Sequence, residues 1–340
     1  MKKRYQNGFF IFGLLVLIIM VTQLDFAAVW QGLKHAGYWF FAVVALWAAL
    51  YVFNTAAWYL IIKGVCSNDA DGKSPRPAPV SFIWLYKVTV SGFALNYATP
   101  GGLMGGEPYR IMELAPKIGT ERASSSVILY AMTHIFSHFC FWLASIVLYL
   151  LIQPLNFFMG VLLSATTAFC LLGIWFFIAG YRKGLANRML NILRHIPLVK
   201  KWARPFVDCH REQLDNIDRQ IAALHRQNPF NFVGSVLLEF SCRVCSALEI
   251  YFILLVLMPE ASYLVCILIL AFTSLFANLL FFMPLQLGGR EGGFLMSAAG
   301  LGLSASAGIF VALIVRIREL VWTGIGLLLI KMGKQAKDQT

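Results

Sequence analysis

The chain has 340 residues, of which 59% are hydrophobic and 13% are charged, and its mean hydropathy is +0.72. About a quarter of the residues of a soluble globular protein are charged, so this composition excludes that class and indicates a membrane protein that crosses the bilayer several times. The net charge is +12. The lysines and arginines gather in a few polar segments between the apolar runs. We expect these basic segments to bind no nucleic acid.

A helix needs about 20 apolar residues to cross a bilayer core. Several apolar runs along the chain approach or exceed that length. Lys2, Lys3 and Arg4 precede the first run, and because no small-residue cleavage site follows it, we expect a retained span rather than a signal peptide. Residues 25–37 are predicted to form a short interfacial segment. The predicted full spans are residues 9–24, 38–62, 124–152, 157–180, 230–258 and 305–330.

A glycine-rich stretch over residues 96–114 follows the apolar residues 80–98. Its four glycines and Pro100 disfavour a continuous helix, because each glycine costs about 1 kcal/mol and an interior proline about 3 kcal/mol relative to alanine. Within a bilayer, non-helical backbone is tolerated only where it is buried in protein or lines a wet cavity. Glu107, Arg110 and Glu113 would share one face of a helix that begins near Gly106. Ionisable residues at membrane depth indicate a functional site; a cytoplasmic loop between two spans is the alternative.

A second glycine-rich stretch repeats this pattern over residues 278–294, after the apolar residues 263–283. Pro284 precedes Glu291 by seven residues, as Pro100 precedes Glu107. Broken segments at corresponding places in two halves of a chain are typical of a transporter binding site. We therefore expect the two glutamates to approach one another, or one cavity, near the middle of the bilayer.

The distribution of Lys and Arg predicts the topology, because cytoplasmic segments carry the excess of these residues. The basic segments are the two termini and residues 63–79, 110–122 and 181–229. Placing all of them inside makes residues 80–119 enter and leave on the cytoplasmic face and residues 261–304 on the outer face. Residues 181–229 are then an amphipathic cytoplasmic insertion, and both termini are cytoplasmic.

The predicted fold class is therefore an all-α polytopic membrane protein with an inverted repeat. It has about six full spans and two re-entrant hairpins of opposite orientation. Residues 1–340 form a single membrane domain, in which 1–152 are the first repeat and 153–340 the second. Eight ordinary spans with a different inside–outside pattern are the competing prediction.

Other ionisable residues lie within predicted spans. Glu239 and Arg243 are four residues apart, so we expect them to pair on one helix face, either as part of a site or as a structural ion pair. Arg316, Arg318 and Glu319 lie midway along the last span, and because both arginines cannot pair equally with Glu319, we expect at least one to face a cavity. A guanidinium there would suit a phosphate through two parallel hydrogen bonds.

Two histidines, His134 and His138, have the four-residue spacing of a metal-binding helix face. No glutamate stands beside them as in a zinc-protease helix and no third ligand is evident, so interhelical hydrogen bonding is the favoured interpretation. We expect no metal and no cofactor.

The two glycine-rich motifs resemble the membrane region of lysylphosphatidylglycerol synthases, also called the flippase-like membrane family. The matching residues are Asn96-x3-Pro100-Gly101-Gly102-x2-Gly105-Gly106-Glu107-Pro-x-Arg110 and Pro284-x3-Gly288-Gly289-Arg290-Glu291. In the multidomain synthases an aminoacyl-transferase domain follows this region. Here the sequence ends ten residues after the last predicted span, so the resemblance implies lipid handling without lysyl transfer.

The expected function is translocation of a lipid or lipid-linked carrier, with an anionic phosphate-containing headgroup, across the cytoplasmic membrane. The substrate would be a membrane lipid or a polyprenyl-phosphate-linked molecule. The alternatives are a membrane-embedded lipid-modifying enzyme, although no catalytic constellation is evident, and an assembly partner of a glycosyltransferase or aminoacyltransferase. An oligomer is compatible with the sequence. The candidate substrate-binding residues are Asn96, Pro100, Gly101, Gly102, Gly105, Gly106, Glu107, Arg110, Glu239, Arg243, Pro284, Gly288, Gly289, Arg290, Glu291, Arg316 and Arg318.

Overall fold

Every regular element in the described part of the chain is a helix. The structure is a computed structural model that describes residues 26–67, 79–98, 105–183, 229–279 and 289–338. The predicted span 9–24, most of the basic insertion, and Pro100, Gly101, Gly102, Pro284 and Gly288 lie outside these residues. The helices are α2 Phe26–Ala36, α3 Tyr38–Ser67, α4 Phe82–Ala98, α5 Gly106–Ile118, α6 Thr120–Ile152, α7 Phe157–Lys183, α11 Pro229–Leu257, α12 Tyr263–Leu279, α13 Gly289–Gly300 and α14 Ala305–Asp338.

Four of the predicted spans are confirmed by length and composition. Within the described residues, the helices long and apolar enough to cross a membrane cover Tyr38–Cys66, Thr120–Ile152, Phe157–Ile178 and Phe230–Leu257. α12 is equally apolar but has only 17 residues. α14 has 34 residues, and its midway arginines and glutamate make it more polar than the four. The length of α14 is therefore sufficient for a span, while its composition is that of a helix with a buried polar site.

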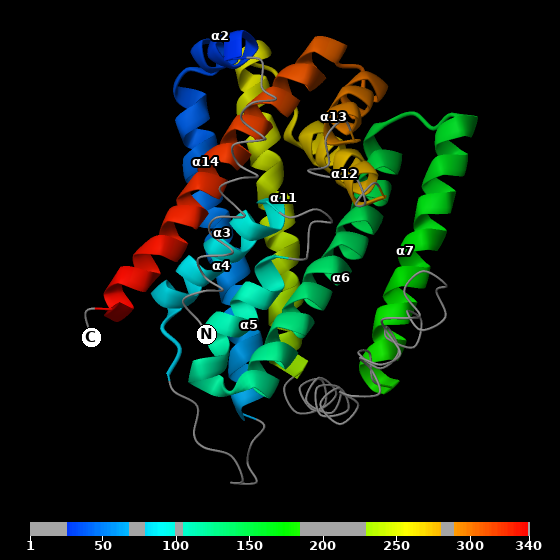
Figure 1. The fold of residues 1–340 in the computed structure, drawn as a ribbon. Coiled ribbons are helices and arrows are strands. Elements are labelled where there is room, and N and C mark those ends of the chain that lie inside the picture. Colours follow the sequence, from blue (N-terminus) through cyan, green and yellow to red (C-terminus); the bar gives the residue numbers. More distant parts are fainter. Residues whose placement is uncertain (1–25, 68–78, 99–104, 184–228, 280–288, 339–340) are drawn as a thin grey trace, which may run out of the picture.

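Two pairs of short helices lie toward opposite ends of the bundle. Figure 1 shows α4 and α5 in the lower half of the view and α12 and α13 in the upper half, with α14 running obliquely between the two ends. α14 packs against both α4 and α13, while α11 makes its most extensive contact with α3. The last helix therefore connects the two short pairs.

Helix ends that flank the predicted basic segments lie together. In Figure 1 the end of α3, the α5–α6 junction, the end of α7 and the start of α11 are at the bottom. The connection between α6 and α7, which has no Lys or Arg, is at the top together with α2. This arrangement agrees with the grouping of segments that the Lys and Arg distribution predicts.

Small residues bring α4 close to its neighbours. A Cβ atom added at Gly106 would overlap the carbonyl oxygen of Gly92, so α5 begins directly against α4. On the other side of α4, a Cβ at Gly326 of α14 would overlap the Cβ of Ala94. The hydroxyl of Ser91 donates a hydrogen bond to the carbonyl oxygen of Gly326 at 3.0 Å. Close backbone contact of this kind is typical of helix packing in membranes, where no hydrophobic effect drives helices together.

Candidate functional site

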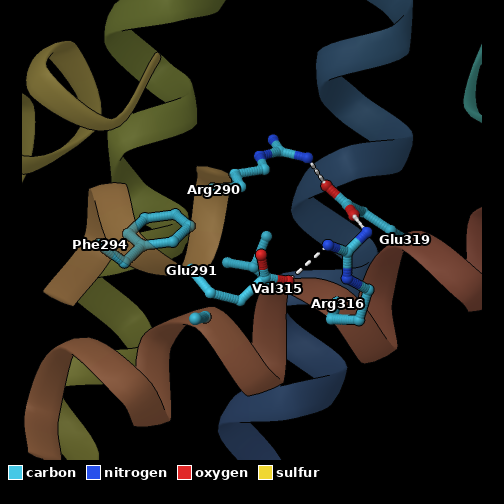
Figure 2. A pocket seen from close by; sticks show the side chains of 7 residues that line it. Arg290, Glu291, Phe294, Val315, Arg316 and Glu319 are labelled. Carbon is cyan, nitrogen blue, oxygen red and sulfur yellow. Dashed lines mark hydrogen bonds and ion pairs between the residues drawn. The ribbon is translucent and has the colours of Figure 1, made fainter. Parts of the chain in front are cut away.

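Four charged residues from the second glycine-rich motif and the last helix meet in one cluster. α13 begins at Gly289, so Arg290 and Glu291 stand in its first turn, and both face α14. Arg290 is paired with Glu319, Arg316 is paired with Glu291, and the guanidinium of Arg316 also lies 3.4 Å from Glu319. Figure 2 shows the four side chains pointing toward one another. We call Arg290, Glu291, Arg316 and Glu319 the α13–α14 cluster.

The α13–α14 cluster lines a small cleft. Phe294, Ala312 and Val315 complete its walls, and the side chains leave no room for a water molecule between them. The cleft is thus closed around its own ion pairs. Two arginines and two glutamates also make the cluster electrically neutral.

The two carboxylates of the cluster differ in exposure. The side chain of Glu319 is 1% exposed, whereas that of Glu291 is 40% exposed. An exposed carboxylate loses less hydration energy than a buried one when it forms an ion pair, and water can solvate it again when the pair opens. Opening the pair between Glu291 and Arg316 would therefore cost less than opening the pair between Arg290 and Glu319.

Arg318 binds elsewhere, although it is only two residues from Arg316. Its guanidinium donates two hydrogen bonds to Glu249 of α11, at 2.7 and 2.9 Å. The same group stacks on the ring of Trp47 at 3.9 Å, and the Trp47 indole donates to Glu249 at 2.9 Å. Arg318 is completely buried. Arg316 thus lines the cleft, and its facing a cavity stays a prediction, whereas Arg318 holds α14 to α11 and α3.

One residue of the first motif reaches the α13–α14 cluster. Tyr97, adjacent to Asn96 near the end of α4, interacts through its hydroxyl with the guanidinium of Arg290 and with the carboxylate of Glu319. A direct meeting of Glu107 and Glu291 stays a prediction, because their described partners differ. Among the described residues, Tyr97 is a contact between the first motif and the α13–α14 cluster.

The first glycine-rich motif forms a second cluster, between α4 and α5. The Asn96 side chain accepts a hydrogen bond from the backbone N–H of Gly106 at 2.8 Å and donates to Glu107 at 3.1 Å. Arg110 donates to Glu107 at 3.2 Å, which confirms that these two share the face of a helix beginning at Gly106. We call Asn96, Glu107 and Arg110 the α4–α5 cluster.

Three aromatic rings enclose the guanidinium of Arg110. Its central carbon lies 4.7 Å from the ring centre of Phe93, 5.3 Å from that of Tyr130 and 5.7 Å from that of Trp58. Within the described residues, the Nε atom of Arg110 and one oxygen of Glu107 are buried without a hydrogen-bond partner. A buried polar atom without a hydrogen bond lowers the stability of the fold, unless another state of the protein or a ligand supplies that hydrogen bond.

In the described part of the chain, Glu239 and Arg243 make their hydrogen bonds to other helices, while their charges interact along α11 without a direct contact. Glu239 accepts a hydrogen bond from Asn54 at 3.0 Å and lies 2.7 Å from Nδ1 of His134. Arg243 donates to the hydroxyl of Ser137 at 2.8 Å and to the carbonyl oxygen of His134 at 3.0 Å. The reason is that α6 packs against this face of α11 and offers both side chains interhelical partners. The interhelical hydrogen bond expected of the histidines is confirmed for His134.

Three residues that make these contacts are not among the candidates predicted from the sequence: Glu249, Tyr97 and Glu319. Glu249 stands inside an apolar helix, ten residues after Glu239, and a lone carboxylate in a span indicates a buried partner. That signal was present in the sequence. No sequence feature distinguishes Tyr97 from the other tyrosines of the chain.

Comparison with protein families gives one match that spans nearly the whole chain. The family model described as "Lysylphosphatidylglycerol synthase TM region" matches residues 8–326. The match includes both glycine-rich motifs, α11 and the charged middle of α14. Comparisons with curated proteins and with solved structures give no match.

Proposed function

The chain belongs to the family of the lysylphosphatidylglycerol synthase TM region, and from this premise we propose that it translocates a phosphate-containing lipid or lipid-linked carrier across the cytoplasmic membrane. The family supports a lipid-related role in the membrane. The α13–α14 cluster supports the headgroup chemistry, because it holds two arginines beside a partly exposed carboxylate. The proposal assigns the protein no catalytic step.

In this proposal the two pairs of short helices are re-entrant hairpins. α4–α5 enters from the cytoplasmic face and α12–α13 from the outer face, and they belong to inverted repeats over residues 1–152 and 153–340. Their opposite positions in the bundle support this interpretation (Figure 1). Half-helices whose N-termini face a central site are typical of transporters, since those N-termini offer N–H groups to an anion. Both α5 and α13 begin at the glycines of their motifs.

The observation that carries the proposal is the position of Arg316. Its guanidinium, on a helix long enough to span, is held by the partly exposed Glu291 across a cleft between α13 and α14. A phosphate can accept two hydrogen bonds from a guanidinium and has the same charge sign as the carboxylate that it would replace. Because the cluster is neutral, replacing Glu291 by one negative charge keeps it neutral.

Reconstituted vesicles test the proposal. Purified protein would be incorporated into liposomes that contain trace fluorescent phosphatidylglycerol, fluorescent polyprenyl phosphate, or a fluorescent phosphate-free glycosyl diacylglycerol. Dithionite added outside bleaches only outer-leaflet probes. We expect the protected pool of at least one phosphate lipid to be lost faster than in protein-free vesicles, and that of the phosphate-free lipid to be unaffected. Equal rates with and without protein for both phosphate lipids would contradict the proposal.

The same vesicles distinguish the enzyme alternative. Mass spectrometry of the extracted lipids should show each probe unchanged after translocation. A probe of altered mass that depends on the protein would favour a lipid-modifying enzyme. A glycosyltransferase or aminoacyltransferase that is encoded by a neighbouring gene, copurifies with the protein and is needed for transport would favour an assembly role.

A further inference from the structure

A buried carboxylate–imidazole pair lies outside the α13–α14 cluster, in the middle of two long helices. Nδ1 of His134 on α6 is 2.7 Å from Glu239 on α11, and Asn54 on α3 donates to the other oxygen of Glu239. The side chain of Glu239 is 1% exposed, whereas that of His134 is 28% exposed. The carboxylate is thus sealed inside the bundle, while the imidazole keeps an accessible edge.

Nε2 is the nitrogen of His134 that can take a proton. With Nδ1–H donating to the Glu239 carboxylate, neutral His134 has a free lone pair on Nε2. A proton added there makes an imidazolium whose Nδ1–H still faces the carboxylate, and no bond within the protein needs to break. A histidine is the side chain whose ordinary titration range lies nearest neutral pH, and Glu and His chains inside membranes are typical of proton relays.

Burial and the charges of neighbouring helices act on the protonation of His134. Burial disfavours a positive charge on the imidazole most strongly, Arg243 on α11 and Arg110 on α5 also oppose it, and Glu239 favours it. His138 lies one turn along α6, with its ring centre 5.5 Å from that of His134, and its Nδ1 is buried without a partner in the described chain. Tyr130 and Cys242 complete the titratable groups near the pair.

The pair is adjacent to the α4–α5 cluster. The rings of Phe93 and Tyr130 contact the guanidinium of Arg110, and the same two rings lie 6.1 and 6.3 Å from the ring of His134. With His134 neutral, Arg110 and Arg243 balance Glu107 and Glu239, so the local charge is zero. A proton raises it to +1, and a monoanion arriving at Arg110 restores neutrality. In a low-dielectric interior the neutral combination is strongly favoured.

We propose that His134, held by Glu239, is a proton-binding site whose occupancy is coupled to that of an anionic lipid headgroup at the α4–α5 cluster, a second headgroup position besides the α13–α14 cluster. The coupling rests on the proposed function, whereas the proton site does not. Coupling between two sites is reciprocal: if the headgroup favours the proton, the proton favours the headgroup by the same factor. Headgroup affinity then rises as the pH falls through the titration of His134, by at most about tenfold per pH unit for one proton. A pH gradient could then bias the direction of transport.

The first test follows His134 itself. Protein labelled with 13C-histidine and purified in detergent would be titrated from pH 5 to pH 9 by NMR, with the His134 signal identified by its loss in His134→Gln. We expect this signal to titrate, and to titrate at higher pH after phosphatidylglycerol is added. A His134 signal that does not change between pH 5 and pH 9, with or without the lipid, overturns the proposal.

The second test measures affinity for phosphatidylglycerol in mixed micelles at pH 5.5, 7.0 and 8.5. Wild-type affinity should fall as the pH rises. His134→Gln, whose amide can still donate to Glu239, should lose this dependence, and the matched His138→Gln should retain it. If the affinity of His134→Gln for phosphatidylglycerol depends on pH as in wild type, the coupling is overturned. A residue with a merely structural role would not set that pH dependence.

Two outcomes separate this proposal from the proposed function. If phosphatidylglycerol does not bind at any pH, the headgroup assignment fails, while the titration of His134 in lipid-free protein still decides the proton site. If His134→Gln does not fold, Glu239→Gln replaces it: removal of the carboxylate should make His134 titrate at lower pH. An unshifted His134 titration in that variant overturns the pair.

Discussion

Arg316 and Arg318 lie two residues apart on α14 and bind carboxylates on different helices. Arg316 reaches Glu291 on α13, at the edge of a cleft, while Arg318 is completely buried and binds Glu249 on α11. Two residues on a helix are separated by about 200°, so the side chains face opposite sides. One helix thus presents a partly exposed ion pair to one neighbour and a completely buried one to another.

Neutralising either Arg290 or Glu291 should abolish transport while leaving folded yield largely intact. Glu291 is 40% exposed and Arg290 is 22% exposed, and in either variant the buried partners left behind, Arg316 and Glu319, keep their contact with each other at 3.4 Å. Arg290→Gln and Glu291→Gln would be compared with wild type for lipid translocation in vesicles and for monodisperse protein after detergent extraction. Yield that falls in proportion to transport would make the pair a structural clamp.

Breaking the pair between Arg318 and Glu249 should have the opposite signature. Removing one partner of a buried ion pair costs about 3–5 kcal/mol, because the remaining charge has no access to water. Glu249→Gln and Arg318→Gln should therefore lose most of their monodisperse yield. Arg316→Gln, two residues away, is the matched control and should be recovered at near-wild-type levels. Normal yield of both core variants would contradict the assignment of this pair.

Two glycines on α14 should respond in opposite ways to alanine. A Cβ at Gly326 would overlap Ala94 on α4, whereas a Cβ at Gly324 meets nothing within 4 Å. Overpacking costs about 1–3 kcal/mol, and replacing an unrestricted helical glycine gains about 0.5–1 kcal/mol. Gly326→Ala should lower the thermal unfolding temperature in detergent, and Gly324→Ala should leave it unchanged or raise it. Equal responses would mean that α4 and α14 are not in close contact.

Tyr97→Phe should weaken transport without affecting folding. The change removes only the hydroxyl that interacts with Arg290 and Glu319, and an interaction of this kind contributes about 1 kcal/mol, or roughly fivefold in a rate or affinity. Tyr86→Phe, which removes a hydroxyl bonded to the carbonyl oxygen of Ala48 on α3, is the control and should transport normally. If Tyr97→Phe transports as well as Tyr86→Phe, the contact of Tyr97 with Arg290 and Glu319 plays no part in transport.

Residues 181–229 are predicted to be cytoplasmic. A cysteine introduced as Arg194→Cys, in a background without the seven native cysteines, should not react with a membrane-impermeant maleimide added to intact cells. It should react after permeabilisation. Efficient labelling of intact cells would overturn the inside–outside assignment, and with it the predicted orientation of both re-entrant hairpins.

Local features of the sequence determined the helices and their breaks. Apolar runs bounded by polar residues produced spans that the structure confirms at Tyr38–Cys66, Thr120–Ile152, Phe157–Ile178 and Phe230–Leu257. The glycines before Glu107 marked the start of α5, and the three-residue spacing placed Glu107 and Arg110 on one face. These properties depend on backbone hydrogen bonding and side-chain hydropathy within one segment, which the sequence contains in full.

Only the tertiary structure decided which charges are partners. Glu239 stands one helical turn from Arg243, yet it binds His134, 105 residues earlier in the chain. Arg318 is next to Glu319, yet its two shortest contacts are with Glu249 on another helix. A side chain buried in a bundle can contact several helices at similar distance, and the packing of those helices sets which partner is nearest and best aligned. Sequence spacing describes only the contacts within a single helix.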